Sequence, residues 1–120
     1  MRVLLDNCVN RRFGRHISGG EVTHVQELNW GGLSNGKLLR AAEYAGFDVL
    51  LTVDKSVRMQ QNLAGRRLTL ITRDAPTILL EDLTQFIGQL EITLGAMAAS
   101  GERGADVVLA LPTEDEKDRR

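Results

Sequence analysis

The chain begins with MRVLLD at residues 1–6, and a matching segment, VLLTVD, occupies residues 49–54. Each segment is a short apolar run that ends in an aspartate, and a potential helix follows each one. Such runs predict buried strands of a parallel sheet. Asp6 and Asp54 would then lie at the carboxyl ends of their strands, which is the edge where parallel α/β folds bind ligands. Two carboxylates at that edge can hold a hard divalent cation such as Mg²⁺.

The rest of the chain alternates between predicted strands and helices. The apolar runs predict strands over residues 2–5, 21–25, 47–52, 68–72 and 105–111. The helical spacing and its stop signals predict helices over residues 7–17, 35–45, 55–64 and 77–97. This alternation is typical of a three-layer α/β/α sandwich with a mostly parallel sheet of four to five strands. If the first four strands take the order 2-1-3-4, the first and third are neighbours and Asp6 comes close to Asp54.

The longest predicted helix, over residues 77–97, carries an apolar stripe at helical spacing. The stripe consists of Leu79, Leu83, Phe86, Leu90 and Leu94. We expect it to be buried, partly against the sheet. A second copy of the chain could cover the remainder, so a homodimer stays open at this point.

Length, composition and charge set limits on the function. The 120 residues carry a net charge of -1, so any attraction to nucleic acid must come from a local basic surface. We expect a single domain over residues 1–111 and a disordered, charged tail over residues 112–120. Cys8 is the only cysteine, which fits a reducing cytoplasm, and we expect it to be a buried small apolar residue. No apolar run approaches the ~20 residues that span a bilayer, so no membrane association is expected.

Several basic residues are predicted near the same end of the fold. The candidates for contact with RNA phosphates are Arg11, Arg12, Arg15, Lys55 and Arg58, with Arg73 expected on the flank of the same rim. Such contacts would be sensitive to salt. The alternative, an ordinary solvated helix face, has equal weight. No aromatic residues are interleaved with these charges, so base stacking is not indicated.

Three segments in order resemble the small PIN-like proteins of the DUF5615 family. They are MRVLLDNCV at residues 1–9, GLSNG at residues 32–36 and LLTVDK at residues 50–55. Each segment is short, but their order and spacing together are fairly specific, and the likeness covers roughly residues 1–83. PIN domains are metal-dependent ribonucleases that use clustered acidic residues, and many are toxins of bacterial toxin–antitoxin pairs. The resemblance therefore implies a Mg²⁺- or Mn²⁺-dependent endoribonuclease with a small DUF433-type antitoxin as partner.

The resemblance also implies roles for individual residues. Asp6 and Asp54 would hold the metal, and Asn35 and Asp74 would assist catalysis through ligation or water. Two positions depart from the family pattern, because Asn7 and Asn35 stand where the family often has an acid. These departures favour an alternative, a PIN-like binding module that lacks nuclease activity and acts through a protein partner.

Each candidate acid also has a structural explanation that needs no metal. Asp6 and Asp54 could each act only as the N-cap of the helix that follows. Asp74 precedes Pro76 and could be an ordinary turn residue. One aspartate can act both as a cap and as a ligand.

Overall fold

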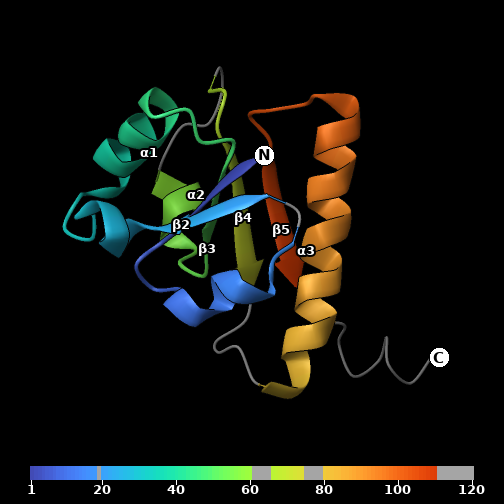
Figure 1. Cartoon of the computed structure of the whole chain (residues 1–120). Helices are drawn as coiled ribbons and strands as arrows, with labels where there is room; N and C mark the ends of the chain where they lie inside the picture. The colour runs from blue at the N-terminus through green and yellow to red at the C-terminus, as the bar shows by residue number, and fades with distance from the viewer. Residues whose placement is uncertain (19, 61–65, 75–79, 111–120) are drawn as a thin grey trace.

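The computed structural model describes residues 1–18, 20–60, 66–74 and 80–110, which form an α/β fold around one five-stranded sheet (Figure 1). The strands are β1 (Arg2–Leu5), β2 (Glu21–His24), β3 (Val49–Thr52), β4 (Thr69–Asp74) and β5 (Asp106–Ala110). Every neighbouring pair is parallel, and the order is β2-β1-β3-β4-β5. The predicted order 2-1-3-4 is therefore confirmed, and β5 extends the sheet beyond β4.

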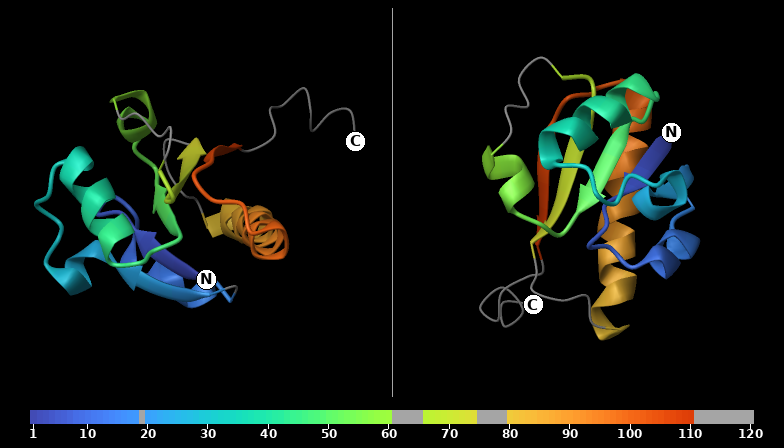
Figure 2. Two further views of the ribbon diagram at one scale, coloured as in Figure 1. Left: turned by 90° about the horizontal axis from the view of Figure 1, so that it is seen from above. Right: turned by 90° about the vertical axis from the view of Figure 1, so that its left-hand side faces the viewer.

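Helices cover both faces of the sheet, as the predicted three-layer sandwich requires (Figure 2). One face carries α1 (Asn35–Tyr44), α2 (Ser56–Gln60) and the short 3-10 helix η2 (Val25–Leu28). The opposite face carries α3 (Leu80–Ser100) and the 3-10 helix η1 (Arg11–His16). Successive strand residues point to opposite faces, so Leu50 belongs to the core under α1 while Leu51 belongs to the core under α3. Burial on both faces explains why the strands read as unbroken apolar runs.

The helix predicted over residues 7–17 is much shorter than expected. The chain first makes a turn in which the Val9 N–H donates to the Asp6 carbonyl oxygen, and only then forms η1, whose N-cap is Asn10. Gly14 lets η1 approach β2 closely, since a Cβ at this position would lie 3.1 Å from a methyl carbon of Val22. The apolar spacing still predicted which side chains are buried, because Val9, Phe13 and Ile17 all lie in one core.

Helix α3 supplies most of the cover on its face of the sheet. Phe86, Leu90 and Leu94 are buried there as predicted, and Met97 continues the stripe. Leu79 lies outside the described residues, as does the predicted tail over residues 112–120, and the Leu83 side chain is not among the described side chains. In the described part of the chain, no helix combines the length and apolar character needed to cross a bilayer.

The crossover connection from β4 to β5, which runs through α3, has the opposite handedness to the other three crossover connections. The β3–β4 and β4–β5 connections step in the same direction across the sheet, but α2 lies on one face and α3 on the other. The β1–β2 and β2–β3 connections share the hand of β3–β4. Since parallel crossovers are right-handed in about 98% of cases, the mixture of hands is unusual. It lets one long helix cover a face on which, among the described elements, the only other helix is the six-residue η1.

The placement of α3 can be tested with two substitutions on the same helix. Leu90 is fully buried, so Leu90→Asp should destabilise the protein by several kcal/mol because it buries an unpaired charge. Ile92 is 75% exposed, and Ile92→Asp should change stability by only about 0.5 kcal/mol. Urea unfolding of both variants measures the difference. Equal destabilisation by the two substitutions would contradict the observed face of α3.

Candidate functional site

Asp6 follows β1 directly and is almost fully buried, with 9% of its surface exposed. Its backbone N–H donates to the Leu51 carbonyl oxygen at 2.9 Å, so the residue continues the pairing of β1 with β3. Oδ2 accepts a hydrogen bond from the Thr52 hydroxyl at 2.7 Å, and Oδ1 accepts one from the Asn7 backbone N–H at 2.7 Å. These bonds fix the carboxylate at the carboxyl end of the strand, as the sequence predicts.

Asp54 lies two residues beyond β3 and caps α2. Its Oδ1 atom accepts from the Ser56 hydroxyl at 2.7 Å and from the Ser56 backbone N–H at 2.9 Å. These two bonds, the hydroxyl first, hold the pKa of Asp54 below its ordinary value. These bonds tie Asp54 to the first residue of α2, as the capping explanation expects. They leave Oδ2 of this exposed residue without a hydrogen bond among the described residues.

The Thr52 hydroxyl connects the two strand ends. It donates to the Asp6 carboxylate at 2.7 Å and accepts from the Asp54 backbone N–H at 3.0 Å. Beyond this point the chain leaves β1 toward the η1 face and leaves β3 toward the α2 face. Open α/β sheets usually bind ligands where the connections of neighbouring strands diverge in this way. Thr52 was not predicted as a site residue, although it belongs to the segment LLTVDK and lies two residues before Asp54.

The two proposed helpers also lie toward this edge. Asn35 is the first residue of α1, which starts at the carboxyl edge because it follows β2 and leads back to the start of β3; the side chain is half-buried. Asp74 is the last residue of β4, next to β3 in the sheet, and its side chain is not among those described. The fold thus brings the backbone positions of Asp6, Asp54, Asn35 and Asp74 to one edge.

The donor types at this edge suit a hard cation, but the acids are few. Carboxylate and amide oxygens are the ligands that Mg²⁺ and Mn²⁺ take, and Mg²⁺ is often bound by one or two carboxylates together with substrate phosphates. Within residues 1–18, 20–60, 66–74 and 80–110, no three His, Cys, Asp or Glu side chains are grouped closely enough to hold a metal ion. A divalent cation here would therefore depend on water and a bound phosphate for most of its ligands.

Cys8 and His24 border the candidate site without belonging to a metal cluster. The prediction that Cys8 is buried is wrong: the thiol is exposed, 3.6 Å from Asp6 Oδ2 and 3.4 Å from the Thr52 hydroxyl oxygen, because the turn after β1 carries it outward. His24 is buried, with Nε2 2.7 Å from the Val9 carbonyl oxygen and Nδ1 accepting from the Gln26 N–H. Both ring nitrogens of His24 therefore have structural roles.

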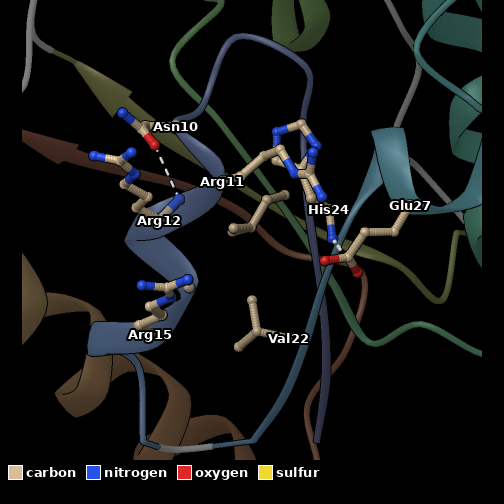
Figure 3. A pocket seen from close by; sticks show the side chains of 9 residues that line it. Asn10, Arg11, Arg12, Arg15, Val22, His24 and Glu27 are labelled. Carbon is tan, nitrogen blue, oxygen red and sulfur yellow. Dashed lines mark hydrogen bonds between the residues drawn. The ribbon is translucent and has the colours of Figure 1, made fainter.

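The basic residues separate into two groups. Arg11, Arg12 and Arg15 are exposed on η1 and line an open hollow of about 570 Å³ beside β1 and β2 (Figure 3). Arg58 lies in α2 on the opposite face, where its guanidinium group makes a bidentate ion pair with Asp106 at 2.9–3.2 Å. Lys55 is exposed and lies between Asp54 and the first residue of α2.

Arg73 does not belong to an exposed basic rim, so this expectation is wrong. The residue is fully buried on β4, and its guanidinium carbon lies 4.6 Å from the centre of the Phe86 ring. Strand alternation explains the difference, because Arg73 points to the same face as Ile71, toward α3.

Comparisons with protein-family models, with curated proteins and with solved structures found no match for this chain.

The role of Thr52 can be tested by removing its hydroxyl group. Thr52→Val keeps the shape but leaves the nearly buried Asp6 carboxylate with one donor fewer, so we expect a loss of about 1–3 kcal/mol in unfolding free energy. Thr52→Ser keeps the hydroxyl and should recover most of this loss. Urea unfolding of the three proteins provides the measurement. A Thr52→Val protein as stable as the parent would show that the hydroxyl does not hold the two strand ends.

The cap at Asp54 predicts a specific pH dependence. Because the folded pKa of Asp54 is depressed, the cap stabilises the fold above the unfolded pKa, and this contribution is lost as the pH falls through the folded pKa. Ser56→Ala should raise the pKa of Asp54 toward its ordinary value and reduce stability above about pH 4. NMR titration of the Asp54 carboxyl carbon measures the shift. Ser34→Ala is the control, since Ser34 caps α1 without a side-chain hydrogen bond. An unchanged Asp54 titration in Ser56→Ala would contradict the assigned cause.

Proposed function

We propose that this protein is a Mg²⁺- or Mn²⁺-dependent endoribonuclease of the PIN-like type. The observation that carries the proposal is the connection of Asp6 and Asp54 through the Thr52 hydroxyl, at the point where the β1 and β3 connections diverge. Open α/β sheets usually bind ligands at such a point. The resemblance of three segments to the DUF5615 family supports the same interpretation.

In this proposal each residue has a separate task. The Asp6 carboxylate is held in place by Thr52 and Asn7, so it offers a fixed oxygen ligand. Asp54 offers the carboxylate oxygen that does not cap α2. Asn35 and Asp74 assist through ligation or by orienting water. A bound divalent cation would make a coordinated water more acidic and offset the charge of the scissile phosphate.

The proposed biological setting follows from the family resemblance alone. We propose that the nuclease is the toxin of a toxin–antitoxin pair and that a small DUF433-type protein restrains it. A homodimer remains a prediction, as does a cytoplasmic location.

A second candidate function is a binding module without nuclease activity. The observation that favours it is that both acids already accept hydrogen bonds from the protein. Asp6 accepts from Thr52 and Asn7, and Asp54 accepts twice from Ser56. An acid that only holds strand ends and caps a helix needs no metal.

RNA cleavage by the purified protein across a Mn²⁺ series distinguishes the two functions. With so few acids, we expect weak metal binding and cleavage that requires millimolar Mg²⁺ or the better-binding Mn²⁺. Asp6→Asn should abolish cleavage and leave the fold intact, because an amide keeps the shape but cannot offset a divalent charge. The control variant is Glu102→Gln, which changes an exposed acid that follows α3, and it should cleave RNA like the parent.

Two outcomes would count against the nuclease. Absence of cleavage by the parent at every metal concentration would favour the binding module. Equal cleavage by the parent and Asp6→Asn would place the reaction at another site or in a contaminating enzyme.

A further inference from the structure

We propose that the hollow formed by η1, β1 and β2 binds the phosphate groups of single-stranded RNA. It is lined by Leu5, Asn10, Arg11, Arg12, Gly14, Arg15, Val22, His24 and Glu27. We call it the arginine hollow. The proposal rests on the proposed function for its choice of RNA as the ligand, but it concerns binding and requires no metal.

The shape of the arginine hollow follows from the short 3-10 helix. Such a helix has three residues per turn, so Arg12 and Arg15 lie one above the other while Arg11 projects in another direction. Figure 3 shows this arrangement, with Arg11 near His24 and Glu27 and the other two arginines along η1. The full α-helix expected from the sequence would have spread these side chains differently.

The packing of η1 keeps the arginine hollow in place. The Asn10 side chain accepts from the Arg12 backbone N–H at 2.9 Å and fixes the start of η1. Buried Phe13 anchors the helix in the core beneath α3. Gly14 allows close contact with Val22. The arginines therefore project from a fixed backbone.

The charges of the arginine hollow are not neutralised within the described part of the chain. There, no hydrogen bond or ion pair involves the guanidinium groups of Arg11, Arg12 and Arg15, and Glu27 is the only carboxylate in the lining. Three other described arginines, by contrast, are paired with carboxylates. Ion pairs of 2.8–3.0 Å join Arg58 to Asp106, Arg66 to Glu43 and Arg103 to Asp48. In a chain with a net charge of -1, the arginine hollow is thus a local positive surface.

The ligand that fits best is a flexible chain of phosphates. Guanidinium groups bind phosphate oxygens through paired N–H donors, and several arginines in a row suit a repeating anion. The volume of about 570 Å³ exceeds what one phosphate needs and can hold a nucleotide-sized group over the apolar floor of Leu5 and Val22. Leu5 is the last residue of β1 and His24 the last of β2, so the hollow adjoins the carboxyl ends of two strands, and Asp6 follows β1 directly.

The test measures binding of a fluorescein-labelled, single-stranded RNA of about 12 nucleotides by anisotropy. The full-length protein is titrated in EDTA, which prevents metal-dependent cleavage, over a series of NaCl concentrations. The test variant carries Arg11→Gln, Arg12→Gln and Arg15→Gln. Removing one arginine–phosphate interaction should reduce the magnitude of the slope of log K against log salt concentration by about 0.7. The slope of the triple variant should therefore be smaller in magnitude by about 2. Its affinity at about 50 mM NaCl should fall tenfold or more.

A matched variant controls for net charge. Lys37→Gln, Arg40→Gln and Arg67→Gln also remove three positive charges from exposed positions outside the arginine hollow. It should retain most of the parent affinity and slope. Circular dichroism verifies that both variants are folded, and single Arg→Gln variants replace the triple variant if it is unfolded.

Four results would overturn the proposal. The first is no RNA binding by the parent at low salt, and the second is an equal loss of affinity in both triple variants. The third is displacement of RNA by poly-glutamate at equal charge concentration, which would indicate an acidic protein as the ligand. Loss of RNA binding in the test variant alone supports the proposal, even if no Mn²⁺-dependent cleavage is found. Unchanged binding in that variant refutes it, even if the protein is a nuclease.

Discussion

The parallel pairing of β1 with β3 is the constraint on which the remaining structure depends. Val3, Leu4 and Leu5 lie beside Val49, Leu50 and Leu51 in the middle of the sheet, and all six are almost completely buried. A shift of one residue would exchange the two faces and turn each side chain into the wrong core. The register continues into the bond from the Asp6 N–H to the Leu51 carbonyl oxygen. The position of the candidate site is therefore a consequence of core packing.

The same pairing gives the acids two roles. Asp6 closes the end of β1 through Thr52, and Asp54 starts α2 through Ser56. Structural use of an acid does not exclude ligand binding, since a carboxylate has several acceptor positions. It does lower the number of positions left for a cation, and the proposed site becomes dependent on its substrate for the remaining ligands.

The sequence predicted the elements that rely on short-range signals. Unbroken apolar runs indicated the buried strands, and Gly46, with φ of 86°, marked the end of α1. Side-chain environment was harder to predict because it depends on the tertiary structure. Arg58 and Arg73 are both basic residues near strand or helix ends, yet one is paired with Asp106 and the other lies beneath α3. No local pattern distinguishes them. For the arginine hollow, the sequence indicated the three arginines but not the floor, because the floor comes from β1 and β2.

The reversed crossover through α3 has a consequence for biosynthesis. The face that α3 covers is built largely from the first half of the chain, including Val3, Phe13 and Leu51. A ribosome must therefore release almost the whole domain before this apolar surface can be covered by Phe86, Leu90 and Leu94. Nascent chains with such late contacts fold slowly and expose surfaces that favour aggregation. Translation speed and chaperone supply should consequently influence the yield of this protein more than its modest size suggests.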